Sequence, residues 1–470
     1  MNVTRNRTNG RKLPREGCPQ RVLVEPEWYV EAPTHGKITE NNAIDTDRQP
    51  DRLLEKILSK ENLYEAYKKV VSNKGAGGVD GMQVNELEAY LKQHGDELIQ
   101  QLQNGKYKPN PVRRVEIPKE EKGKVRQLGI PTVVDRVIQQ AIAQVLSPLF
   151  ECQFHECSYG FRPLRSAHDA LKQCQRNADD GYMYVVDMDL EKFFDTVCHS
   201  KLVEVLSRTI LDGRVISLIH KYLNAGVIAN GIFAKSDVGV PQGGPLSPLL
   251  SNIMLNELDW ELHRRGHRFV RYADDCMILC KSKRSAKRTL SNILPYIEGK
   301  LFLKVNQEKT EVVYITKTKF LGYGFYRFTG KCKLRVHPKS VAKMKDTIRK
   351  LTSRSNGWSN EFRAMKLAQF TRGWVNYFKL ADMKSLLTKT DEWLRRKIRA
   401  VYWKQWKKIS TRYCMIEKYG IPKWEVHHMA NCRKGPWRAA LMLNSVLTKK
   451  EIANLGFMSM TDYFLKVCVK

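Results

Sequence analysis

The hydrophobic positions of the chain follow two different periods, and these predict an α+β fold over its first 330 residues. Apolar residues at helical spacing predict helices, and runs that alternate apolar with polar residues predict strands. The expected elements are helices over 52–75 and 133–150, hairpins over 113–131 and 268–280, a strand that turns helical over 182–197, and a Gly/Pro loop leading into a helix over 239–255.

Past Gly330 the pattern changes, and it predicts that strand character stops and long basic helices follow. These helices are expected over 341–354, 360–380 and 391–408, with the acidic pair Asp391 and Glu392 at the N-terminus of the last one. The predicted organisation is therefore α+β followed by all-α. The expected divisions are 1–50 as a polar, largely unstructured extension, 51–328, 329–412 and a basic region over 413–470.

The turn of the second hairpin carries two adjacent carboxylates, Asp274 and Asp275, within "RFVRYADDCMILC". Two acidic side chains at the tip of a buried hairpin lose solvation and repel each other. A divalent metal ion between them and a third ligand removes both penalties. The turn therefore predicts a metal site.

The third carboxylate is expected from "VVDMDL", where Asp187 and Asp189 share one face of a strand. We assign Asp189 as the ligand, because Phe194 follows five residues later in a helical segment. A ring at that position could lie under the sugar of an incoming nucleotide and exclude a 2′-hydroxyl. Asp187 is left as either a structural residue or a helper of the ligands.

The net charge of the chain indicates a polyanionic partner. The chain has a net charge of +32, and residues 331–410 alone hold 22 Lys/Arg against 5 Asp/Glu. With 9 Trp and 19 Tyr, this distribution favours nucleic acid. The 11 cysteines contain no C-x-x-C pair and are expected to be reduced and intracellular, and no apolar run is long enough to span a membrane.

Six ordered motifs now make the sequence recognisable. They are "RQLGIP", "SYGFRPLRSAHDA", "VVDMDLEKFFD", "PQGGPLSPLLSN", "YADD" and "FLGYGF". In this order they resemble the bacterial group II intron-encoded reverse transcriptase/maturase family. The resemblance implies a right-handed polymerase, with fingers and an antiparallel palm sheet up to 328 and a helical thumb, or maturase domain X, after it.

The resemblance also implies roles for individual residues. The catalytic and metal-binding set is Asp189, Asp274 and Asp275, holding two Mg²⁺ ions for which Mn²⁺ can substitute. Contacts to the incoming nucleotide are expected from Lys119, Arg126, Phe194, Gln242, Gly243 and Lys309, the last as a possible general acid near the leaving pyrophosphate. Nucleic-acid contacts are expected from Arg162, Arg372, Trp374, Tyr377, Arg395, Arg396, Arg399, Lys404 and Lys407.

The function implied is an RNA-directed DNA polymerase that is also a maturase, with group II intron RNA, an RNA template with DNA primer, dNTPs and target DNA as partners. Two alternatives stay open: a retron-type or host-adapted repair enzyme, and a non-catalytic RNA-binding splicing factor. Other metal chemistry is not expected. "CQFHEC" (152–157) supplies three zinc ligands without a fourth, and the C-terminal region lacks the paired C-x-x-C of an HNH nuclease.

Overall fold

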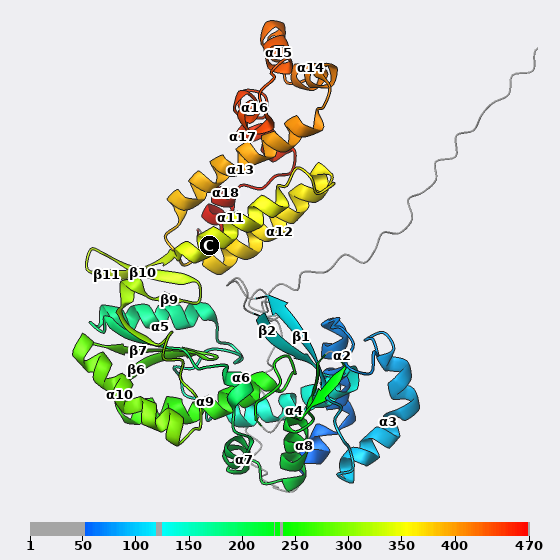
Figure 1. Cartoon of the computed structure of the whole chain (residues 1–470), viewed down its shortest axis with the longest axis vertical. Coiled ribbons are helices and arrows are strands. Elements are labelled where there is room, and N and C mark those ends of the chain that lie inside the picture. Colours follow the sequence, from blue (N-terminus) through cyan, green and yellow to red (C-terminus); the bar gives the residue numbers. More distant parts are fainter. Residues whose placement is uncertain (1–51, 119–124, 230, 236–237, 469–470) are drawn as a thin grey trace, which may run out of the picture. The chain divides into compact units, whose positions relative to one another are not determined.

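The computed structural model describes residues 52–118, 125–229, 231–235 and 238–468 (Figure 1). The predictions for residues 1–50 and for Lys119 lie outside these ranges. None of the helices in the described ranges is both long enough and apolar enough to cross a lipid bilayer.

A four-stranded antiparallel sheet with the order β6-β7-β3-β8 carries the predicted acidic residues. Its strands are β3 (Tyr184–Met188), β6 (Arg268–Tyr272), β7 (Asp275–Cys280) and β8 (Glu311–Tyr314). The predicted hairpin over 268–280 and the strand near 184 are confirmed. Both central strands are buried, as their β-branched and apolar residues require.

The two faces of this sheet belong to two different cores. Alternate residues of β3 point to opposite faces, so Val186 enters one core and Val185 the other. Helices α9 (Ser247–Arg264) and α10 (Lys283–Gly299) contribute to the first core, and α5 (Ala167–Asp179) contributes to the second.

The segment before and around this sheet supplies a second four-stranded sheet, with the order β2-β1-β4-β5. Its strands are β1 (Val112–Pro118), β2 (Val125–Ile130), β4 (Val227–Ala229) and β5 (Ile232–Ala234), and its helices are α1 (Leu53–Ile57), α2 (Lys60–Ser72), α3 (Leu87–Gln103), α4 (Val133–Glu151), α6 (Phe193–Thr196), α7 (His199–Ser207) and α8 (Gly213–Leu223). The helix predicted over 52–75 is split in two, because the Ser59 side chain caps α2 by accepting from the Asn62 amide.

Strand character does not stop at Gly330, so that prediction was wrong. Strands β9 (Lys319–Phe320), β10 (Tyr323–Phe328) and β11 (Lys331–Val336) form a three-stranded sheet, preceded by a short 3₁₀ turn at Ile315–Lys317. Cys332, Leu334 and Val336 are buried at period two while charged residues stand between them. The alternation that identifies β11 is thus present in the sequence.

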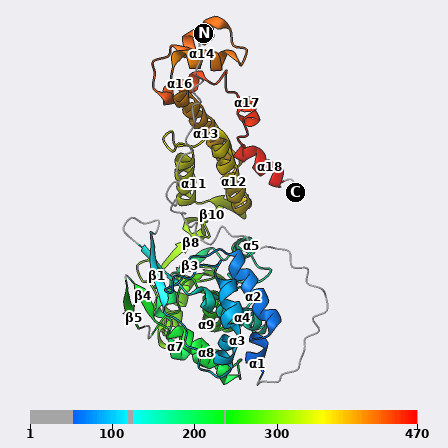
Figure 2. The same ribbon diagram turned by 90° about the vertical axis from the view of Figure 1, so that its right-hand side faces the viewer.

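Eight helices occupy the rest of the described chain (Figures 1 and 2). They are α11 (Pro338–Leu351), α12 (Asn360–Phe378), α13 (Lys384–Gln405), α14 (Ile409–Glu417), α15 (Lys423–Ala430), α16 (Pro436–Met442), α17 (Lys449–Asn454) and α18 (Met460–Cys468). The three predicted basic helices are present with shifted ends.

Asp391 does not begin a helix, which corrects the predicted N-terminus. Helix α13 begins at Lys384, and Asp391 is buried in its interior. Its carboxylate accepts hydrogen bonds from the backbone amides of Met460 and Thr461, each at 2.9 Å, and from the Ser459 hydroxyl. The acidic residue therefore caps α18, a different helix, and joins the C-terminal region to α13.

Candidate active site

The tip of the β6–β7 hairpin places the two adjacent aspartates at one end of the sheet. Tyr272 pairs with Asp275, so Ala273 and Asp274 form a two-residue turn. Ala273 has φ +55°, a left-handed conformation that short hairpin turns require and that alanine adopts at a cost. The tight turn therefore places both carboxylates at the end of the sheet, in adjacent positions of the chain.

Asp189 lies next to this turn because of the strand register. Met188 of β3 pairs with Cys276 of β7 as the last pair of the ladder, so Asp189 and Asp275 are the next residues at the same end of the two strands. The Asp189 amide donates to the Thr310 hydroxyl, and its carbonyl accepts from Asn306. Asp189 therefore directly follows the end of β3, beside the acidic turn, and its assignment as the metal ligand stays a prediction.

The acidic end of the sheet gathers several carboxylates whose pKa values are raised. The carboxyls of Asp274 and Asp275 reach solvent but are closely surrounded by protein. Burial, with Asp274, Asp187 and Asp189 nearby, raises the pKa of Asp275 to about 7. Burial also raises the pKa of Asp274, and burial together with Glu311 and Asp189 raises that of Asp187 to about 6. Groups this reluctant to ionise favour a cation as their partner.

Three basic side chains lie close enough to act on these carboxylates. The Lys309 ammonium is 3.1 Å from Asp189 Oδ2. Arg126 on β2 lowers the pKa of Asp274, and Lys319 lowers that of Asp275, each by its charge. The structure therefore brings two predicted nucleotide contacts, Arg126 and Lys309, to the aspartates, and it adds Lys319, which the sequence analysis missed.

The donor set suits a hard divalent ion, which prefers carboxylate oxygens. In the described ranges, however, no three His, Cys, Asp or Glu side chains are already arranged around a metal position. The ammonium of Lys309 lies against Oδ2 of Asp189. The aspartates fit a metal by chemistry and charge, and a metal bound at that oxygen would compete with this lysine.

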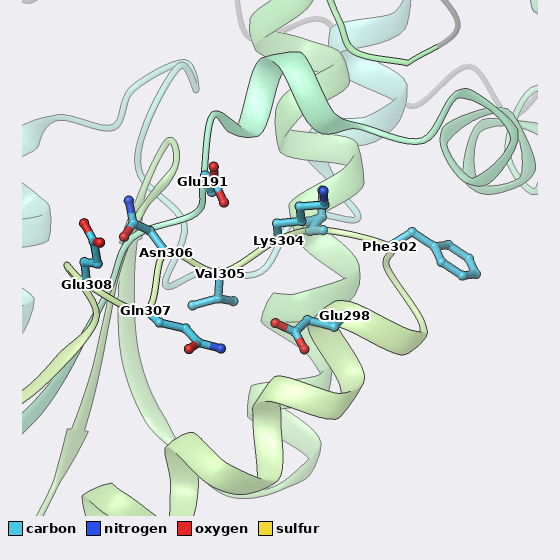
Figure 3. Close-up of a pocket in the computed structure, with 9 residues that line it drawn as sticks. Glu191, Glu298, Phe302, Lys304, Val305, Asn306, Gln307 and Glu308 are labelled. Carbon is cyan, nitrogen blue, oxygen red and sulfur yellow. The ribbon is translucent and has the colours of Figure 1, made fainter. Parts of the chain in front are cut away.

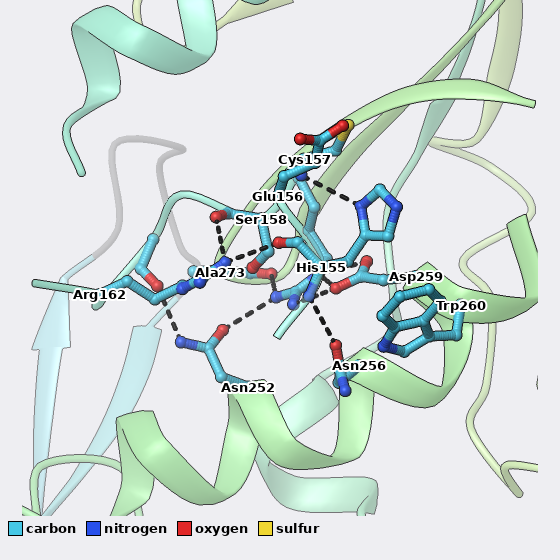
Figure 4. Close-up of polar contacts among 12 residues, drawn as sticks. His155, Glu156, Cys157, Ser158, Arg162, Asn252, Asn256, Asp259, Trp260 and Ala273 are labelled. Carbon is cyan, nitrogen blue, oxygen red and sulfur yellow. Dashed lines mark hydrogen bonds and ion pairs between the residues drawn. The ribbon is translucent and has the colours of Figure 1, made fainter. Parts of the chain in front are cut away.

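A buried arginine holds the acidic turn from behind. Arg271 and Asp259 are both fully buried and form a bidentate ion pair, with Nε–Oδ1 at 2.8 Å and Nη2–Oδ2 at 2.5 Å. Arg271 Nη1 also donates to Asn252 Oδ1 and to the Ala273 carbonyl, each at 2.9 Å. Figure 4 shows Asn252 and Asp259 on one helix, beside Ala273.

The "YGFR" segment packs against the same turn. The Asn252 amide donates to the Gly160 carbonyl at 2.8 Å, and a Cβ on Gly160 would collide with the backbone nitrogen of Ala273. Arg162 is buried, pairs with Glu151 at 2.7 Å and donates to the carbonyls of His155 and Ser158. The segment therefore supports the turn, and Arg162 has no surface on which to contact nucleic acid.

Sequence reasoning did not single out this network, although it left a signal. Arg271 follows two apolar residues in a strand, a position where a solvated charge is not expected. Asn252 and Asp259 are seven residues apart on α9, which places them on one face of the helix. The sequence therefore contained enough information to predict that Arg271 is buried with Asn252 and Asp259 as polar partners.

The loop before α9 packs on β2 through its glycines. The Gly129 amide donates to the Gln242 carbonyl at 2.6 Å, and Gly243 has φ +111°. A Cβ on Gly243 would lie 2.6 Å from the Gly129 carbonyl oxygen. Packing against β2 is therefore enough to require glycine at position 243, independently of any contact with a nucleotide.

Phe194 lies on α6 and is hydrogen-bonded to the start of the same loop. Its carbonyl accepts from the Val240 amide at 2.6 Å, and its ring makes an edge contact with Phe193. The ring is half-buried. This backbone hydrogen bond connects Phe194, the predicted contact to the sugar, with the loop that contains Gly243.

A pocket of about 760 Å³ lies beside Asp189 but contains none of the predicted nucleotide contacts (Figure 3). Its lining residues are Glu191, Glu298, Phe302, Leu303, Lys304, Val305, Asn306, Gln307 and Glu308. Three carboxylates against one ammonium repel a triphosphate. The nucleotide site is better sought at the aspartates.

The predicted nucleic-acid contacts of the helical region divide by exposure. Trp374 and Arg399 are buried, and Arg399 donates to the Leu447 carbonyl at 2.8 Å. Tyr377 donates from its hydroxyl to the Leu321 carbonyl at 2.9 Å. The half-buried or exposed members are Arg372, Tyr377, Arg395, Arg396, Lys404 and Lys407. Burial in this structure leaves only this last group accessible to RNA.

An antiparallel sheet that ends in three aspartates, followed by a basic helical region, defines the class: a nucleic-acid polymerase of the palm type. Residues 117–325 match the reverse transcriptase (RNA-dependent DNA polymerase) family, and residues 341–420 match the group II intron, maturase-specific domain.

Protein YkfC of Escherichia coli (strain K12) is 36% identical over 326 residues, which cover 61% of this chain and 85% of that protein. Group II intron-encoded protein LtrA of Lactococcus lactis subsp. cremoris is 32% identical over 377 residues, which cover 65% of this chain but only 63% of LtrA. The solved partial Cas6-RT-Cas1–Cas2 complex is 25% identical, covers 53% of this chain and 43% of that chain, and has a TM-score of 0.34. The chain belongs to the reverse transcriptase family, in the group that carries the maturase-specific domain of group II introns.

Proposed function

We propose that this chain copies RNA into DNA at the end of the β3, β6 and β7 strands, with Asp189, Asp274 and Asp275 as its catalytic residues. The observation that supports the proposal is the register of the neighbouring strands β3 and β7, whose last pair, Met188–Cys276, leaves Asp189 and Asp275 at the same end of the sheet beside the Asp274 turn. Burial, with the charges of Asp274, Asp187 and Asp189, raises the pKa of Asp275 to about 7, which favours a cation at this place.

The three aspartates would hold two Mg²⁺ ions, which supply activation of the primer 3′-hydroxyl and neutralisation of the triphosphate. Arg126 and Lys309 would bind the phosphates of the incoming nucleotide, and Lys309, once released from Asp189, would donate a proton to the leaving pyrophosphate. Phe194 would exclude a 2′-hydroxyl. Gln242 would hydrogen-bond the nucleotide or template from the loop that Gly243 packs onto β2.

We further propose that the helical region binds group II intron RNA and assists its splicing. The match of residues 341–420 to the maturase-specific domain favours this role over a retron-type enzyme. In the described part of this region Arg372, Lys404 and Lys407 offer exposed cations for phosphates. The expected setting is a ribonucleoprotein in the bacterial cytoplasm that inserts and copies its intron at target DNA.

The test is primer extension on an RNA template by the Asp274→Asn variant, which keeps the side-chain shape and removes the charge. We expect activity to fall by at least about a hundredfold, because a charged ligand at the reacting centre is lost. The matched control is Asp462→Asn, which changes an exposed carboxylate on α18 and should leave extension unchanged.

Full extension by Asp274→Asn would refute the assignment of the site. Splicing that persists in a wild-type protein without any DNA synthesis would instead support a non-catalytic splicing factor.

A further inference from the structure

Three helices of the C-terminal half converge on a small pocket that no motif identified. Its volume is about 300 Å³, at the lower end of ligand-binding pockets. The lining residues are Arg349 of α11, Thr352 and Arg354 after it, Trp393, Lys397 and Ala400 of α13, and Trp437 of α16. Residues 349, 393 and 437 are far apart in the sequence, so only the packing of these helices creates the pocket.

Two tryptophans form its aromatic surfaces, and each carries a cation on its ring. The Lys397 ammonium is 5.2 Å and the Arg349 guanidinium 5.7 Å from the ring centre of Trp393. The Arg396 guanidinium is 4.0 Å from that of Trp437 and also donates to the Trp437 carbonyl at 3.1 Å. These contacts fix both rings, and Trp437 remains 39% exposed.

The pocket is positive without a matching carboxylate in its lining. Arg349 pairs with Asp346 on its own helix, whereas among the described residues Arg354 and Lys397 have no ion-pair partner. Burial and the charges of Arg349 and Arg354 lower the pKa of Lys397. Cations gathered against their own repulsion are stabilised by a bound anion.

We propose that this pocket binds one unpaired nucleotide of a single-stranded RNA segment, with its base against Trp393 or Trp437 and its phosphate at Arg354 and Lys397. Aromatic surfaces stack on any base, and clustered cations hold the backbone, which together are the requirements of single-strand binding. A base in a duplex is already stacked and paired, so duplex RNA cannot fill the pocket. The proposal rests on RNA as the partner of the proposed function and specifies where and in what form that RNA is bound.

The test measures the affinity of the full chain for a fluorescein-labelled single-stranded oligoribonucleotide of mixed sequence. The variants are Trp437→Ala, which removes a half-exposed ring, and Lys397→Glu, which reverses one charge without emptying a core. The controls are Trp424→Ala, a 74% exposed tryptophan on α15, and Lys450→Glu, an exposed lysine on α17, both outside the pocket lining.

We expect each pocket variant to weaken single-strand binding at least about fivefold more than its control does, with blunt duplex RNA affected equally in variant and control. Pocket variants that bind the single strand as their controls do would overturn the proposal. A loss of duplex binding in the pocket variants as large as their loss of single-strand binding would also overturn it, as would displacement of the oligoribonucleotide by polyglutamate at equal charge concentration.

Primer extension measured on the same proteins separates this proposal from the proposed function. If the wild type extends primers and the pocket variants bind single-stranded RNA as their controls do, the proposed polymerase function stands and the pocket proposal fails. If the pocket variants specifically lose single-strand binding but the wild type extends no primer, the pocket proposal stands and the proposed polymerase function fails.

Discussion

Arg271 is a fully buried cation directly before the acidic turn, and its partners decide whether that turn keeps its shape. Its three contacts, with Asp259, Asn252 and the Ala273 carbonyl, come from a helix and from the turn itself. Removing one member of a buried ion pair leaves the other charged and without a partner, which costs more than the pair contributes.

We therefore predict that Asp259→Leu lowers the free energy of unfolding by about 3–5 kcal/mol. The double variant Asp259→Leu/Arg271→Met should recover most of this loss, since neither charge remains. It should not recover primer extension, because the Ala273 carbonyl has lost its donor and the turn is less well fixed. Urea unfolding and primer extension on the same samples check both statements.

The control for this prediction is Lys449→Ala, which breaks an exposed pair with Asp462 and should change unfolding by less than about 1 kcal/mol. A double variant that regains both stability and activity would show that Arg271 only fills space.

Phe194 offers a second test at this scale. In Phe194→Ala the preference for deoxynucleotides over ribonucleotides should fall about tenfold or more, because a ring that excludes the 2′-hydroxyl is gone. Incorporation of each nucleotide type opposite RNA template measures the ratio. Phe302→Ala is the matched control, since it removes a ring that is 56% exposed in the acidic pocket. An unchanged ratio in Phe194→Ala would end the assignment of this ring.

Single residues differ in how far the sequence predicts them. Asp274 and Asp275 were predictable because carboxylates between two apolar strands have few explanations. Trp374 was misread as a nucleic-acid contact, because helical spacing does not say which face of a helix meets the core. Arg162 was misread likewise, since its partner Glu151 belongs to a different element.

At the scale of elements, α18 depends on a residue of α13. Its first amides, those of Met460 and Thr461, donate to the Asp391 carboxylate. Unpaired amides at a helix start otherwise need water or a local cap.

Asp391→Ala should therefore destabilise α18 by about 2 kcal/mol while leaving the palm sheet intact. Faster amide hydrogen exchange confined to residues 460–468 would confirm the prediction. The neighbouring Glu392→Ala removes an exposed carboxylate and should leave exchange unchanged. Equal exchange in both variants would contradict the assigned cap.

Elements with a strong period were predictable and their junctions were not. The helix over 133–150 is confirmed as α4, because its apolar stripe is long and Thr132 caps it. Strand β11 was missed although Cys332, Leu334 and Val336 alternate with charged residues, because strand character was expected to stop at Gly330.

For the whole molecule, the net charge of +32 makes RNA binding depend on salt. If six or more phosphates are contacted, raising monovalent salt from about 50 to about 200 mM should weaken RNA binding by about a thousandfold or more. Equilibrium binding across this range measures the slope. The melting temperature of the free protein in the same buffers separates this effect from unfolding. A slope near zero would mean that the charge serves another purpose.

Tertiary packing sets the limit of sequence reasoning at this scale. The succession of an α+β part and a helical part could be predicted from a change of period, although strands continue to Val336 and not only to Gly330. The pocket between Arg349, Trp393 and Trp437 could not, because no local pattern connects three segments that meet only after the helices pack.

The ion pair between Lys309 and Asp189 bears on how the protein exists before any metal arrives. A side chain of the protein itself already balances the charge of Asp189, so this edge of the sheet does not wait for a divalent ion in order to fold. Chelation should then silence the enzyme reversibly and leave its melting temperature unaltered, and an apoprotein prepared in this way should regain activity on simple addition of Mg²⁺.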